Sequence, residues 1–196
     1  MSVTISKTRG ILVDVARQLF AKKGVDNTTM NDIALASGKG RRTLYTYFKN
    51  KNEIYLAVVD TELDRLYNML LDVAEKDLPA DAKLINFIYT RLDSLKAVVF
   101  RNGTLKATFF RDIWRVEKVR KNFDQKEIEI IESILVAGVK ENIFSMPDTH
   151  VTALVLHYAI RGLEVPYIRG IMGDNIDQRI NRRDNVINLI FNGIKI

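Results

Sequence analysis

The stretch that decides the fold is residues 28–51, TTMNDIALASGKGRRTLYTYFKNK. Its two leading threonines are good N-cap residues, and the apolar positions after them recur at helical spacing. Gly38 and Gly40 predict the end of this first helix, because glycine tolerates the positive φ of a tight turn. A second short helix is expected from Arg41 onward. The stretch therefore predicts two helices joined by a sharp turn.

The second helix carries a buried pair and a polar face. Leu44 and Phe48 are four residues apart, so they share one face of the helix and can be buried together. This layout is that of a helix-turn-helix, whose second helix enters the major groove of DNA. A basic helix can also be a plain solvated face, but here the turn, the caps, the apolar pair and the charge agree. The residues expected to face outward are Arg41, Arg42, Thr43, Tyr45 and Tyr47.

The positive charge of the chain is concentrated near the N-terminus. The whole chain has a net charge of +6. Residues 1–52 hold ten basic and three acidic side chains, an excess of +7, whereas residues 53–196 hold twenty and twenty-one, an excess of −1. A basic segment attached to a neutral remainder is typical of a protein that binds a polyanion. We therefore predict a DNA-binding domain at residues 1–52 and a second domain at residues 53–196.

The composition excludes several classes of protein. The chain has no cysteine, which excludes disulfides and thiol catalysis. Its first residues lack the apolar run of a signal peptide, and no uncharged apolar run reaches the roughly 18 residues of a membrane span. We expect a cytoplasmic protein without a membrane partner.

Apolar residues recur at helical spacing through the rest of the chain, without an alternating strand pattern. We therefore predict an all-α fold of about nine helices, in which three N-terminal helices form the helix-turn-helix domain. Gly24 should cap the first helix, and Pro166 should kink or end the eighth, which begins near Asp148. Besides the two helices of the central stretch, the expected helices cover residues 7–23, 52–76, 80–99, 104–116, 123–142, 148–166 and 175–194.

From Arg9 to Val58 the sequence resembles the N-terminal domain of TetR-family transcriptional regulators. The resemblance covers about a quarter of the chain, and many positions match in order and spacing. It departs at Lys39, where the family usually has a small apolar residue, and at Gly40, where it usually places a serine or similar cap. The matching residues are Ile11, Leu12, Ala16, Leu19, Phe20, Gly24, Thr28, Thr29, Asp32, Ile33, Ala34, Gly38, Thr43, Leu44, Tyr45, Tyr47, Phe48 and Lys51.

The resemblance implies a ligand-responsive regulator, most often a repressor, that binds a pseudo-palindromic operator in double-stranded DNA as a homodimer. The long helix at residues 52–76 would then be the lever between the ligand-binding domain and the DNA reader. Arginines at the start of the second helix can form bidentate bonds to guanine edges or phosphates. The residues expected to read or clamp DNA are Arg41, Arg42, Thr43, Tyr45 and Tyr47, with Thr28, Thr29 and Lys51 on phosphates.

The resemblance also implies a ligand cavity and a dimer interface in residues 53–196. Each aromatic residue of the middle of the chain is, taken singly, best explained as core, but as a group they could surround a small apolar or aromatic effector. The candidate ligand-binding residues are Phe87, Phe109, Phe110, Trp114 and Tyr158. The candidate dimer-interface residues, on the last two helices, are Leu154, Tyr158, Ile187, Ile190 and Phe191.

Motifs for catalysis or metal binding are not found in the sequence. There is no glycine-rich phosphate loop, nucleophile elbow or zinc spacing. His150 and His157 are seven residues apart, whereas metal ligands on one helix favour a spacing of three or four. Arg161 and Glu164 are expected to pair on a helix surface. We predict no metal, no cofactor and no enzyme activity. A ligand-independent DNA-binding or protein-interaction module remains the alternative.

Overall fold

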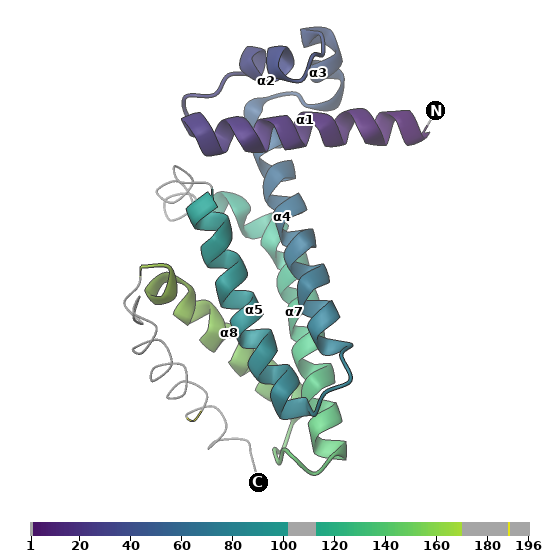
Figure 1. The fold of residues 1–196 in the computed structure, drawn as a ribbon, viewed down its shortest axis with the longest axis vertical. Helices are drawn as coiled ribbons and strands as arrows, with labels where there is room; N and C mark the ends of the chain where they lie inside the picture. The colour runs from purple at the N-terminus through teal and green to yellow at the C-terminus, as the bar shows by residue number, and fades with distance from the viewer. Residues whose placement is uncertain (1, 102–112, 170–187, 189–196) are drawn as a thin grey trace. The chain divides into compact units, whose positions relative to one another are not determined.

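The computed structural model describes residues 2–101, 113–169 and 188, and this part of the chain contains helices and no β-strand (Figure 1). The all-α prediction is confirmed to that extent. Seven helices are described: α1 (Ser2–Lys23), α2 (Met30–Ala36), α3 (Arg41–Tyr47), α4 (Lys51–Ala74), α5 (Ala80–Arg101), α7 (Ile113–Lys140) and α8 (Thr149–Ile168).

The predicted number of about nine helices differs from these seven. Helices were expected at residues 104–116 and 123–142 with a break between them, but α7 is continuous from Ile113 to Lys140, so this break is wrong. The segment between, EKVRKN, is polar but rich in good helix formers, and Glu117, Lys121 and Asn122 are exposed. The helix expected at residues 175–194 and the start of the one expected at residue 104 lie outside the described residues.

Two compact units divide the chain. The first comprises residues 1–64 and 98–121, and the second comprises residues 65–97 and 122–196. Helix α4 contributes its first half to the first unit and its second half to the second unit. A boundary after residue 52 stays a prediction, because α4 is continuous across that position. Among the described helices, none is long and apolar enough to cross a membrane.

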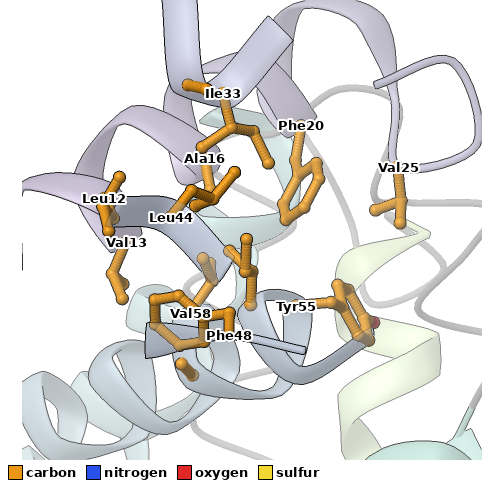
Figure 2. Close-up of a cluster of buried hydrophobic side chains, with 13 residues drawn as sticks. Leu12, Val13, Ala16, Phe20, Val25, Ile33, Leu44, Phe48, Tyr55 and Val58 are labelled. Atoms are coloured by element: carbon orange, nitrogen blue, oxygen red, sulfur yellow. The ribbon is translucent and has the colours of Figure 1, made fainter. Parts of the chain in front are cut away.

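The first unit is built on a cluster of apolar side chains from α1 to α4 (Figure 2). Phe20 of α1 meets Tyr55 of α4 edge to face, with ring centroids 6.2 Å apart. Arg17 of α1 also lies 3.8 Å from Glu62 of α4. Helix α4 therefore completes a core that the three short N-terminal helices would close poorly alone. The cluster consists of Leu12, Val13, Ala16, Phe20, Val25, Ile33, Ala34, Leu44, Phe48, Ile54, Tyr55, Ala57 and Val58.

The second unit has a separate core, to which α4, α5, α7 and α8 contribute. Leu70 of α4, Leu84 and Ile88 of α5, and Ile131 of α7 are fully buried. Helix α8 begins with the carboxylate of Asp148, which accepts a hydrogen bond from the backbone N–H of Val151. Pro166 lies in the last turn of α8, in agreement with its predicted effect on the end of the helix.

Candidate nucleic-acid interface

Helix α2 begins at a capping box. The hydroxyl of Thr29 accepts a hydrogen bond from the backbone N–H of Asp32 (3.1 Å), and the carboxylate of Asp32 accepts one from the backbone N–H of Thr29 (2.9 Å). The backbone N–H of Thr29, followed by its hydroxyl, lowers the pKa of Asp32, and Lys23 adds to the effect. The predicted N-cap role of Thr29 is confirmed.

The turn between α2 and α3 uses its two glycines differently. Gly38 has φ +64°, the left-handed conformation that glycine adopts without strain, as predicted. Gly40 has φ −64° and ψ 148°, so it does not use the positive φ that glycine permits. It is the N-cap of α3, and it has no side chain with which to cap the helix. The absence of a serine at this position therefore removes a cap but leaves the turn intact.

Helix α3 buries one face and exposes the opposite one. Leu44 is fully buried and Phe48 is 3% exposed, and Figure 2 shows both among side chains from α1, α2 and α4. Arg41 and Arg42 are exposed, and Tyr45 is 46% exposed. Arg41 and Tyr45 are four positions apart, and so are Arg42 and Thr46. Residues at this spacing share one side of a helix, so the exposed residues form one polar face with two cations. We call Arg41, Arg42, Tyr45 and Thr46 the α3 face.

The remaining predicted DNA-contact residues occupy other environments. Thr43 and Tyr47 are half-buried, and Tyr47 packs against the apolar cluster. Thr28 is fully buried, and its hydroxyl donates a hydrogen bond to the carbonyl of Gly24 (2.7 Å). In this conformation the Thr28 side chain does not reach a phosphate. It ties the loop before α2 to the end of α1, where Gly24 adopts φ 85° as predicted for a helix cap.

Lys51, at the start of α4, is also engaged within the first unit. Its ammonium donates hydrogen bonds to the carbonyl oxygens of Val25 (2.7 Å) and Asp26 (3.1 Å). An ammonium has three protons, so one remains for another acceptor such as a phosphate. Lys49, two residues before Lys51, is exposed, and its backbone N–H donates a hydrogen bond to the carboxylate of Glu53. The start of α4 therefore adds positive charge to the unit that carries the α3 face.

The candidate ligand-binding residues are placed only in part. Phe87 is fully buried in the second unit, whereas Tyr158 is 61% exposed on α8. Phe109 and Phe110 lie outside the described residues. Trp114 belongs to the first turn of α7, but its side chain is outside the description.

The candidate dimer residues of α8 lie beside an exposed apolar row. Val151 is 53% exposed, Val155 is 62% exposed and Tyr158 is 61% exposed, at spacings of four and three that align them on one face of the helix. Leu154, at the edge of this row, is half-buried. Ile187, Ile190 and Phe191 lie outside the described residues. We call Val151, Val155 and Tyr158 the α8 row.

The second unit contains a buried ionic network that the sequence did not reveal. Arg91 of α5 is 1% exposed, and its guanidinium donates to Glu127 of α7 and to Glu164 of α8, both at 2.5 Å. Burial works against the charge on Arg91, but the two carboxylates outweigh it and raise its pKa. Burial likewise opposes the ionisation of Glu127, but Arg91 and then His157 outweigh it, so the pKa of Glu127 is lowered.

The two residues expected to pair on the surface of α8 have partners on other helices. Arg161 donates to Asp124 of α7 at 3.1 Å. Glu164 is buried against Arg91, so its predicted surface position is wrong. The partners of Arg91 are 36 and 73 residues away in sequence. Spacing along one helix could not have found them.

Comparisons with known proteins agree with the geometry of the first unit. Residues 12–58 match the family model described as bacterial regulatory proteins, tetR family. The HTH-type transcriptional regulator YhgD of Bacillus subtilis is 23% identical over 146 residues, which cover 74% of this chain and 76% of that protein. The family model and this relative both describe regulators, in agreement with the prediction that the chain is not an enzyme.

Solved structures share the fold along nearly the whole chain. A transcriptional regulator from Cytophaga hutchinsonii matches with a TM-score of 0.76 at 23% identity, over 95% of this chain and 98% of that chain. The SmeT–triclosan complex matches with a TM-score of 0.67 at 17% identity, over 97% and 92%. At these identities the structural likeness shows the fold alone. The family match shows that residues 12–58, which hold the helix-turn-helix of the first unit, are similar to the DNA-binding domain of tetR-family regulatory proteins, and the solved structures show a shared fold along nearly the whole chain.

Proposed function

We propose that the protein is a homodimeric repressor that binds a pseudo-palindromic operator and releases it when a small molecule binds the second unit. The observation that carries the proposal is the α3 face, because its two arginines and one tyrosine are exposed on a helix whose opposite side is anchored by Leu44 and Phe48. A rigidly anchored helix with exposed bidentate donors is suited to base recognition in the major groove.

The DNA contacts divide into two kinds in this proposal. Arg41 and Arg42 read base edges, with Tyr45 beside them on the exposed face. Thr29, Thr43, Tyr47 and Lys51 position the protein on phosphates, which carry no sequence information. We leave Thr28 out of the contact set, since its hydroxyl is buried and bonded to Gly24.

The α8 row supports a dimer in which α8 of one copy packs against the same helix of a second copy. Three large apolar side chains side by side are an unusual load for the surface of a monomer. In a two-fold interface the same row occurs on both copies, so the two rows can cover each other. Leu154, Ile187, Ile190 and Phe191 remain proposed members of this interface. The dimer would present two α3 faces to two half-sites.

We propose a small apolar or aromatic effector for the second unit. The buried aromatic ring of Phe87 supports this chemistry, and Tyr158 of the same unit is a further candidate. Phe109, Phe110 and Trp114, which belong to the first unit, stay candidates from the sequence alone. The similar fold of SmeT was solved with triclosan, a small aromatic molecule. Such an effector would change DNA affinity only by binding two conformations of the dimer with different affinity.

The test is selection of binding sequences from a pool of random duplexes by the full chain. We expect enrichment of an inverted repeat whose half-sites are separated by about one or two helical turns. Enrichment of a single unrepeated half-site would contradict the dimeric arrangement. A screen of aromatic compounds for release of the selected duplex then tests the effector. A chain that binds the duplex but responds to no compound would favour a ligand-independent regulator.

A further inference from the structure

Arg9 of α1 lies against the residue that ends α3. Its guanidinium carbon is 5.2 Å from the centroid of the Phe48 ring, and Phe48 is the C-cap of α3. A guanidinium over an aromatic face is attracted to the ring, and this contact leaves its N–H donors for other acceptors. Phe48 is only 3% exposed and belongs to the apolar cluster of the first unit. The anchored ring therefore holds the charge of Arg9 at a defined place beside the end of α3.

Arg9 is an exposed cation that meets no carboxylate within the described part of the chain. Other cations of the first unit are neutralised by the protein itself, since Arg17 lies 3.8 Å from Glu62 and Lys23 lies 3.7 Å from Asp32. An arginine that is already held in place loses little side-chain freedom when an anion binds to it. Its N–H donors match the oxygens of a phosphate, which they can bind in pairs. The surroundings of Arg9 therefore favour an anion from outside the chain.

The position of Arg9 suits one border of the groove that α3 would enter. Helix α3 has 7 residues, so it is about 10 Å long, and the major groove of B-DNA is about 12 Å wide. Arg41 begins the helix and Phe48 follows it, so Arg9 supplies a cation at the end opposite the two arginines of the α3 face. Lys49, the residue after Phe48, is exposed and adds a further positive charge there. With the start of α3 on base edges, its other end approaches the phosphates that border the groove.

We propose that Arg9 binds a phosphate of the DNA backbone and that Phe48 positions its guanidinium for this contact. The proposal rests on the proposed function, because it requires α3 to lie in the major groove. It adds a contact from α1 to a set that otherwise comes from α2, α3 and the start of α4. A phosphate contact carries no sequence information, but it fixes the orientation of α3 on the duplex. The alternative is that the stem of Arg9 only covers the Phe48 ring, as long cationic side chains often do.

The test is titration of the full chain and of Arg9→Met with the selected duplex and with random duplex, at several salt concentrations. Methionine keeps an apolar stem over Phe48 and removes the charge, so the Tm should stay within about 4 °C of the parent value. We expect Arg9→Met to bind both duplexes about tenfold less tightly for each bound copy, as for the loss of a charged hydrogen bond. The slope of log K against log salt should fall in magnitude by about 0.9 for each bound copy.

Two further variants separate a specific contact from net charge. Arg9→Lys should restore the salt slope but only part of the affinity, because an ammonium cannot bind a phosphate through a planar pair of donors. Lys140→Met is the matched control, since it removes one positive charge from an exposed position in the second unit. It should bind both duplexes like the parent. A direct readout replaces single phosphates of the selected duplex by uncharged methylphosphonates. The parent should lose affinity at one phosphate in each half-site where Arg9→Met loses none.

Three results would overturn the proposal. The first is a folded Arg9→Met variant that binds like Lys140→Met, which would leave Arg9 as a cover for Phe48. The second is a loss confined to the selected duplex, which would assign Arg9 to a base. The third is equal sensitivity of the parent and Arg9→Met to every neutralised phosphate. If Arg9→Met does not fold, Arg9→Gln decides by the same measurements. A parent chain that binds no duplex would contradict the proposed function as well, whereas the three results above leave that function standing.

Discussion

Nζ of Lys51 lies 2.7 Å from the backbone carbonyl oxygen of Val25, so the first residue of α4 holds the loop that leads into α2. Val25 itself is buried in the apolar cluster of the first unit, and the next carbonyl, that of Asp26, accepts a second hydrogen bond from the same ammonium. Lys51 therefore connects the start of α4 to the loop in front of the helix-turn-helix.

Replacing this lysine should destabilise the first unit. We expect Lys51→Met to lower the free energy of unfolding by about 1–2 kcal/mol, the low end for hydrogen bonds from a charged group, since the site is partly exposed. Lys49→Met is the matched control, because that lysine is exposed and should change stability by less than about 0.5 kcal/mol. Urea denaturation of both variants is the measurement. Equal stability of the two variants would mean that the Lys51 contacts contribute nothing.

The two glycines of the turn should respond differently to alanine. Gly38→Ala should cost about 1 kcal/mol or more, because alanine is strained at φ +64° even though the space around it is open. Gly40→Ala should cost less, about 0.5 kcal/mol, since φ −64° suits any residue but alanine is a poorer N-cap than glycine. Gly40→Ser should gain a few tenths of a kcal/mol by capping α3. Thermal unfolding of the three variants gives the order, and a larger loss for Gly40→Ala than for Gly38→Ala would contradict the turn geometry.

The helix-turn-helix could be predicted from the sequence because its determinants are local. The cap at Thr29, the left-handed Gly38, and the Leu44–Phe48 pair each act within four residues, which is the range that sequence spacing describes. The break predicted before Phe123 failed for a related reason. A polar segment with good helix propensity looks like a loop when apolar spacing is the only guide, yet it continues α7.

The interior of the second unit could not be predicted in the same way. Arg91 finds Glu127 and Glu164 on two other helices, and His157 meets Asp124 and Glu127 across a helix pair. Local spacing instead suggested a pair of Arg161 with Glu164 on the surface of α8. These contacts depend on which helix faces pack together, and that is decided by the tertiary fold. The same limit applies to Lys51 and Val25, which are 26 residues apart.

The pair of His150 and Glu132 should make stability depend on pH. The hydrogen bond and the negative charge of Glu132, 2.9 Å away, raise the pKa of His150 above its ordinary value of 6.5. The stabilisation is therefore fully present below pH 6.5 and is lost as the pH rises through the raised pKa of the folded state. We expect the Tm difference between the parent and His150→Gln to shrink over that range. A difference that stays constant with pH would contradict the ion pair.

Charges on the α8 row should separate the proposed dimer. Val155 and Tyr158 are mostly exposed, so Val155→Glu/Tyr158→Glu should leave the fold of each chain intact while burying charge at a two-fold interface. We expect a folded monomer in sedimentation and a sharp loss of operator affinity, because one α3 face contacts half a site. Lys140→Glu, at an exposed position of α7, is the control and should sediment like the parent. A folded double variant that remains dimeric would locate the interface elsewhere.

The central claim is that the α3 face reads the DNA sequence, and the most direct test is the ratio of affinities for the selected duplex and for random duplex at one fixed salt concentration. We expect Arg42→Ala or Arg41→Ala to lower this ratio by a factor that corresponds to about 1–3 kcal/mol of binding free energy, because a bidentate contact to a base is lost. Tyr47→Phe should weaken both affinities alike, since a phosphate contact carries no sequence information. If neither arginine variant changes the ratio, the α3 face does not read the sequence and the account is contradicted.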